Sequence, residues 1–79
     1  MDNRHSVATE ADLVERVQDA LLEDERVQDH LIRVLRRGGI IYLQGHATSA
    51  EAREVATRAA AKVPGVQAVV NELQVRART

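Results

Sequence analysis

Three histidines, two serines and a short acidic segment are the side chains of this 79-residue sequence that could support metal or acid–base chemistry. His5, His30 and His46 lack the H-x3-H spacing with which a helix presents two zinc ligands, and the sequence contains no cysteine. Ser6 and Ser49 lack the pattern of a hydrolytic triad, and Ser49 stands where a helix cap is expected. We therefore expect no metal site, no cofactor and no enzymatic activity.

The acidic segment consists of Glu23, Asp24, Glu25 and Asp29. Carboxylates bind hard cations, so this cluster could hold an ion such as K⁺. It lacks the ligand spacing of a calcium-binding loop, and a solvated acidic linker is the preferred interpretation.

The basic, glycine-rich residues 36–39 (RRGG) suggest nucleic-acid binding at first sight. The formal net charge is −1 and the aromatic content is 1%, so neither long-range attraction to nucleic acid nor base stacking is supported. Gly38 and Gly39 instead separate two segments with strand periodicity, as the turn of a hairpin does. We expect no nucleic-acid partner.

The first element expected is a helix that begins at Thr9, where Thr9 and Asp12 have the spacing of a capping box. Its apolar stripe continues to Leu21, and it ends near Glu23 or Asp24. Residues 1–8 are expected to form a flexible tail before a single domain over residues 9–76.

The pattern changes to period two after Leu31 and predicts two strands, the second starting at Ile40 and running to Leu43. A Gly38-Gly39 turn that pairs Arg37 with Ile40 also pairs Val34 with Leu43 and Ile32 with Gly45. A slightly wider turn would shift these partners but keep the same faces.

A second helix is expected from Thr48 or Ser49 to about Lys62, with one buried stripe: Ala52, Val55, Ala56, Ala59 and Val63. Pro64 and Gly65 end it. A third strand follows over about residues 66–75, with Val69, Asn71, Leu73 and Val75 on one face. We interpret Gly45 as a residue that lets the following helix pack closely on its strand.

These elements predict an α+β fold of order α-β-β-α-β, a two-layer sandwich in which two helices cover one face of a three-stranded sheet. The helices should cover the side of Ile32, Val34, Ile41 and Leu43. The opposite side, which we call the helix-free face, should present Leu31, Arg33, Leu35, Ile40, Tyr42, Gln44 and Val70. This face is more apolar than a soluble monomer usually exposes, which indicates a contact surface. Arg33, Arg37 and Arg76 could contact phosphates there.

The same order of residues resembles the BON domain, the bacterial osmotic-shock and nodulation module. The resemblance covers about residues 10–75 and is carried by Ala20, Leu21, Asp24, Ile32, Val34, Gly39, Ile41, Leu43, Gly45, Ser49, Glu51, Ala52, Ala56, Val63, Gly65, Val66, Val69, Asn71, Leu73 and Val75.

The resemblance implies a non-enzymatic role at phospholipid surfaces, often in stress-related proteins. We therefore expect a binding module that contacts a membrane surface or a partner protein through the helix-free face, with a homodimer as one form of partnership. The family also includes a cytosolic potassium-binding protein, so a K⁺-responsive module in stress adaptation is the alternative function. The sequence has no apolar run of ~18 residues and no secretory signal, so we expect a cytoplasmic location, peripheral to the membrane.

Overall fold

The computed structural model describes residues 10–27 and 31–76, with side chains from Leu13 onward in the first helix. Some predictions concern residues whose backbone or side chains are not described: those for the tail with His5 and Ser6, and those for Thr9, Asp12, Asp29 and His30.

A β-hairpin forms the first half of the sheet. Strands β1 (Ile32–Arg37) and β2 (Ile40–Ala47) pair antiparallel, with Arg37 opposite Ile40, Val34 opposite Leu43 and Ile32 opposite Gly45. Gly38 has φ +58°, and a positive φ at the first turn residue is what a two-residue type II′ turn needs. The predicted register is confirmed, although β2 extends four residues beyond its predicted end at Leu43.

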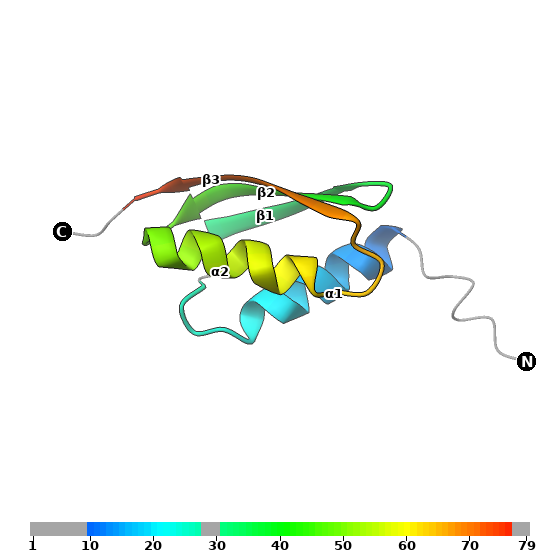
Figure 1. Cartoon of the computed structure of the whole chain (residues 1–79), viewed down its shortest axis with the longest axis horizontal. Coiled ribbons are helices and arrows are strands. Elements are labelled where there is room, and N and C mark those ends of the chain that lie inside the picture. The colour runs from blue at the N-terminus through cyan, green and yellow to red at the C-terminus, as the bar shows by residue number, and fades with distance from the viewer. Residues whose placement is uncertain (1–9, 28–30, 77–79) are drawn as a thin grey trace, which may run out of the picture.

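A helical crossover completes the sheet. Helix α2 (Ala50–Ala61) leads from β2 to β3 (Ala68–Val75), and β3 lies parallel to β2 with Tyr42 opposite Val70. The strand order is β1-β2-β3, so β1 and β3 are the two edges of the sheet (Figure 1). The sequence left this order open.

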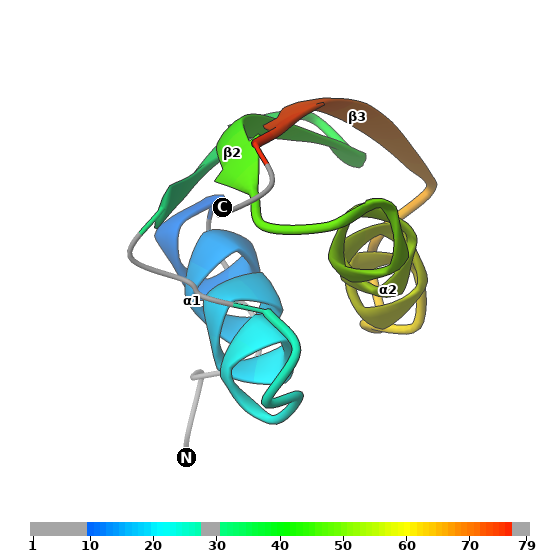
Figure 2. The same cartoon turned by 90° about the vertical axis from the view of Figure 1, so that its left-hand side faces the viewer.

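Both helices lie beneath the same face of the sheet, as the end-on view in Figure 2 shows. Helix α1 (Glu10–Leu22) packs against β1 and α2, whereas α2 packs against β2 and β3. The core between the layers is aliphatic: Leu13, Val17, Leu21, Val27, Val34, Ile41, Leu43, Ala47, Ala52, Val55, Ala56, Ala60, Val63 and Leu73. The predicted α+β sandwich and its covered face are confirmed.

Helix α2 is capped by Ser49, whose hydroxyl accepts a hydrogen bond from the Ala52 N–H at 3.0 Å. Of the two predicted caps, Ser49 is therefore the one used. Lys62 closes the helix, as predicted. The buried stripe differs at one place, because Ala60 is fully buried and Ala59 only partly. Small side chains here let the helix axis approach the sheet closely.

The interpretation of Gly45 was wrong. Its φ is +121°, and a Cβ there would lie 2.1 Å from the carbonyl oxygen of Leu31, which precedes β1. Gly45 is thus required by the backbone that enters β1, not by the helix that follows β2. Gly65, like Gly38, also has a positive φ. The Gly39 carbonyl accepts a hydrogen bond from the N–H of Gln67 at 2.7 Å.

Replacing Val34 with Ala tests the face assignment. Val34 is 8% exposed and its loss leaves a small cavity in the core, so we expect a loss of about 1–3 kcal/mol in the free energy of unfolding. Its neighbour Leu35 is 40% exposed on the other face and supplies a matched control, Leu35→Ala, with a smaller loss. Chemical denaturation measures both, and equal losses would contradict the assignment.

Candidate functional site

On the helix-free face, three rows of side chains run across all three strands. The middle row is Leu35, Tyr42 and Val70, which lie side by side in the sheet register. On one side of it lies the row Arg37, Ile40 and Ala68, and on the other the row Arg33, Gln44 and Glu72.

An apolar patch occupies the centre of this face and comprises Leu35, Ile40, Tyr42 and Val70. Leu35 is 40% and Val70 38% exposed, whereas Ile40 and Tyr42 are partly buried. A shallow depression of about 420 Å³ lies beside the patch and is lined by residues of all three strands: Leu35, Arg36, Arg37, Tyr42, Gln44 and Glu72. The predicted residues of β1, β2 and β3 are therefore brought together, and the patch offers a small apolar contact area.

The β1 side of the patch is basic. Arg33 and Arg37 are exposed there, and within residues 10–27 and 31–76 neither guanidinium lies in an ion pair. Arg76 follows β3 at the far end of the sheet, eight residues after Ala68 and so roughly 26 Å away along the strand at ~3.3 Å per residue. Leu31 lies just outside β1 and is partly buried. Neither Arg76 nor Leu31 therefore borders the apolar patch.

The β3 side of the patch is acidic, and sequence reasoning missed this. Glu72 is exposed on the helix-free face and accepts a hydrogen bond from the Gln44 amide at 2.8 Å. The alternation of β3 could have revealed it, because Val70 and Glu72 share a face in any strand that contains both. The face is consequently polarised, with arginines along β1 and a carboxylate on β3.

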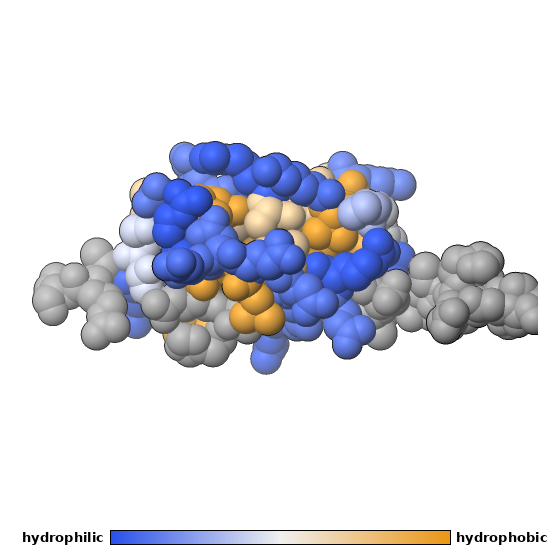
Figure 3. Space-filling view, turned by 90° about the horizontal axis from the view of Figure 1, so that it is seen from below, coloured by the Kyte–Doolittle hydropathy of each residue, from blue (hydrophilic) through white to orange (hydrophobic). Residues whose placement is uncertain are grey.

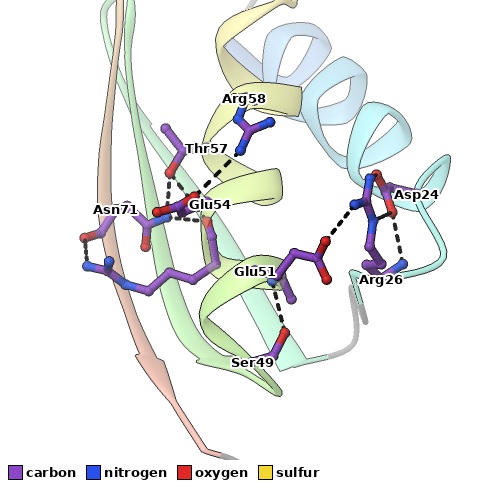
Figure 4. A network of polar contacts seen from close by, with 10 residues as sticks. Asp24, Arg26, Ser49, Glu51, Glu54, Thr57, Arg58 and Asn71 are labelled. Carbon is purple, nitrogen blue, oxygen red and sulfur yellow. Dashed lines mark hydrogen bonds and ion pairs between the residues drawn. The ribbon is translucent and has the colours of Figure 1, made fainter.

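The outer edge of β3 is covered by side chains from α2. Arg53 donates from Nε to the Leu73 carbonyl at 2.9 Å and from Nη2 to the Asn71 carbonyl at 3.4 Å. The Asn71 side chain accepts the Leu73 N–H at 2.9 Å and donates to the Arg53 carbonyl and the Thr57 hydroxyl (Figure 4). The Asn71 amide thus satisfies nearby backbone groups, and the bonds made by Arg53 and Asn71 use the backbone groups that an added strand would need.

Arg26 connects the acidic linker to helix α2 through ion pairs. Its guanidinium donates to both carboxylate oxygens of Asp24, at 3.0 and 2.9 Å, and to Glu51 of α2 at 3.0 Å (Figure 4). The hydrogen bonds from the Arg26 side chain, then from its backbone, hold the pKa of Asp24 below its ordinary value. Among the described residues, no group of three or more His, Asp and Glu side chains is placed to hold a metal ion.

The opposite side of the molecule is formed by the helices. Figure 3 looks onto that side and shows apolar surface between mainly hydrophilic regions. A depression of about 400 Å³ lies between the ends of α1 and α2, lined by Ala20, Glu23, Asp24, Ala59, Lys62, Val63 and Pro64. Leu22 nearby in the chain is 56% exposed. Within the described part of the chain, neither helix has the length and apolar character to span a bilayer.

A family model describes a sequence of this pattern and fold: the BON domain matches residues 9–77. The chain belongs to the BON domain family. BON domains are binding modules rather than a catalytic family, and they are associated with phospholipid and protein interactions. A search of curated proteins gave no match. The resemblance seen in the sequence is thus confirmed over nearly the whole chain.

Removing the Arg53 side chain should uncover the β3 edge. Arg53→Ala leaves two partly buried carbonyls without their charged donor, and we expect a loss of about 1–3 kcal/mol in the free energy of unfolding. The exposed edge should also promote self-association, measured by sedimentation velocity at increasing concentration. Arg58→Ala is the control, since Arg58 makes only an exposed contact with Glu54 at 3.5 Å. A monomeric Arg53→Ala protein of unchanged stability would contradict this role.

The Asp24 carboxyl offers a test by titration. Because Arg26 lowers its pKa in the folded state, the contact stabilises the fold above the unfolded pKa of about 3.9 and is lost as pH falls through the folded pKa. In the Arg26→Gln variant, the Asp24 pKa measured by carboxyl NMR should rise toward its ordinary value. An identical Asp24 titration in both proteins would show that Arg26 does not hold this carboxylate in solution.

Proposed function

We propose that this BON domain binds anionic phospholipid surfaces through its helix-free face. The observation that carries the proposal is the apolar patch beside Arg33 and Arg37, two exposed guanidinium groups that have no carboxylate partner in the described residues. Apolar side chains can enter the headgroup region while neighbouring arginines contact phosphates.

The polarised charge suggests an orientation on the bilayer. Arg33 and Arg37 project from β1, and lipid phosphates attract them by about 1 kcal/mol each. Glu72 projects from β3, where the same surface would repel it. A tilted approach, with β1 nearer the lipid than β3, brings the two arginines and Leu35 into contact while leaving Glu72 in water.

The alternative of a K⁺-responsive module has less support from the described residues. Asp24, one of the carboxylates of the acidic linker, already binds Arg26 through both oxygens. A cation at this carboxylate would have to displace Arg26, whose backbone N–H, Nε and Nη2 all donate to it. The linker is thus better described as a structural ion pair than as a cation site.

Vesicle co-sedimentation tests the proposal. The protein should sediment with phosphatidylcholine vesicles that contain phosphatidylserine, but not with pure phosphatidylcholine. Binding should weaken at about 1 M NaCl, where the Debye length falls to about 3 Å. Arg33→Gln should reduce the affinity about fivefold, as expected for a contact of about 1 kcal/mol. Tyr42→Asp should abolish binding, because it places a charge in the apolar patch.

Arg58→Gln is the matched control, since it removes the same charge from the exposed side of α2 and should leave vesicle binding unchanged. Circular dichroism melting confirms that each variant folds. Salt-independent binding, or equal effects of the Arg33 and Arg58 variants, would refute the lipid-facing orientation. A discrete dimer without vesicle binding would instead assign the helix-free face to a second copy of the chain.

A further inference from the structure

The two edges of the sheet differ in how their backbone groups are satisfied. An edge strand presents a row of N–H and C=O groups that can pair with another extended chain. On β3, the N–H of Leu73 and the carbonyls of Asn71 and Leu73 are engaged by side chains, as described above. This arrangement discourages pairing at that edge.

The backbone of β1 has no such cover. In a two-residue hairpin the closing pair, Arg37 and Ile40, exchanges both hydrogen bonds, and the pattern then alternates along the strand. Arg33 and Leu35 therefore face β2, whereas the N–H and C=O groups of Ile32, Val34 and Arg36 face outward. Among the described residues, no loop or side chain forms a hydrogen bond with these outward groups.

Space is available beside this edge. A depression of about 520 Å³ adjoins the first half of β1 and is lined by Gln18, Leu31, Ile32, Arg33, Val34, Gln44 and Gly45. Gln18 belongs to α1, and α1 packs against β1 from the helix side. The first half of β1 therefore borders an open hollow, which also reaches Gln44 and Gly45 of β2.

The positive charge of β1 determines which kind of extended chain can bind beside it. Three of its six residues are arginine, IRVLRR. Arg33 and Arg37 lie on one face and Arg36 on the other, so both faces carry positive charge. Arg33 and Arg37 flank Leu35 on the helix-free face. Arg36 lies on the other face, where its Nε donates to the Gly38 carbonyl and its buried Nη1 has no hydrogen-bond partner. An incoming strand would meet a cation at three positions.

A second copy of β1 is a poor occupant because like charges meet. Antiparallel self-pairing centred on Leu35 sets Arg33 of each copy opposite Arg37 of the other, and pairing centred on Arg33 or Arg36 sets that arginine opposite itself. Pairing centred on Val34 avoids opposed arginines but still collects both sets of guanidinium groups along one seam. Like charges placed across neighbouring strands are destabilising.

We propose that the outer edge of β1 binds an extended acidic protein segment, which joins the sheet as a fourth strand. Its backbone pairs with Ile32, Val34 and Arg36. On the helix-free face, the segment carries acidic, apolar and acidic side chains at alternate positions, opposite Arg33, Leu35 and Arg37. A further carboxylate on the other face meets Arg36. Backbone pairing supplies the affinity and the alternating side chains supply the specificity, as in other strand-addition complexes.

This site is separate from the proposed lipid contact, although Arg33 and Arg37 border both. Strand addition uses the edge of the sheet and its backbone, whereas lipid binding uses the apolar patch across the strands. The proposal therefore does not rest on the lipid-binding function. It predicts that a bound acidic segment competes with vesicles for the two arginines.

A synthetic peptide tests the proposal directly. We would use a short chain in which Glu, Val and Glu occupy alternate positions, a further Glu stands opposite Arg36 and Thr fills the remaining positions, with a fluorescent label for anisotropy. The wild-type protein should bind it, and binding should fall at least about tenfold for the double variant Arg33→Gln/Arg37→Gln. Arg58→Gln should bind like wild type. Tyr42→Asp, which should abolish vesicle binding, leaves the β1 edge in place and should retain peptide binding.

Two altered peptides separate strand addition from simple charge attraction. A peptide with Lys in place of Glu should not bind. A peptide N-methylated at alternate residues keeps its charges but cannot donate to the β1 edge, and its affinity should be at least about tenfold lower. Equal binding by the methylated and unmethylated peptides would overturn the proposal, as would no binding of the acidic peptide.

Amide hydrogen exchange reports the position of binding. In the protein alone, the amides of Ile32, Val34 and Arg36 should exchange faster than that of Leu73, which donates to Asn71. Adding the acidic peptide should slow exchange at these three amides. Protection of β3 amides instead would place the peptide elsewhere. Protection of the β1 amides that rises with protein concentration, without peptide, would make a second copy the occupant. Either result overturns the proposal.

Discussion

The packing of α2 against β2 and β3 is the contact on which the rest of this small structure depends. Ala52, Ala56 and Ala60 are buried along the helix, and their small side chains allow the helix to lie close to the sheet. Close approach lets Ile41 and Leu43 of the central strand become fully buried in a chain whose core lacks aromatic rings. It also carries the chain from one end of β2 back to the start of β3, which makes that pairing parallel.

The same packing makes the two faces of the sheet differ: the helices cover one face and leave the other uncovered. Both helices lie beneath one face of the sheet (Figure 2). The other face has no helix over it, and Leu35 and Val70 are exposed there. Because α2 lies beneath β3, Arg53 and Asn71 reach the outer edge of that strand, whereas no described side chain hydrogen-bonds to the outward backbone of β1. The proposed lipid contact and the proposed strand-addition site thus use different parts of one sheet, and both include arginines of β1. The BON family role in binding agrees with this distribution of exposed groups.

The polar contacts hold the elements in place. Arg26 ties the linker after α1 to Glu51 in the first turn of α2, and Asn71 joins β3 to Arg53 and Thr57 on the same helix. Each connects residues distant in sequence through groups that are exposed or partly buried. Their effect is to specify the position of α2, while the aliphatic core supplies most of the stability.

Local patterns in the sequence were enough to determine the five elements, the hairpin register and the faces of the strands. These properties depend on neighbours along the chain: two glycines close a tight turn, and side chains alternate between faces once a strand is formed. For this reason Arg33, Leu35 and Tyr42 could be placed on the helix-free face. The family resemblance was also readable, because it consists of spacings along the chain.

Tertiary structure decided the properties that depend on which elements become neighbours. The position of β3 beside β2 placed Glu72 next to Gln44, left Arg76 at the far end of the sheet, and brought Arg53 to the outer edge of β3. The close neighbour of Gly45 proved to be the Leu31 carbonyl, fourteen residues earlier by the numbering. The contacts of Glu72 and Arg53 join segments whose separation in space is set by helix packing, and no periodicity in the sequence records that distance.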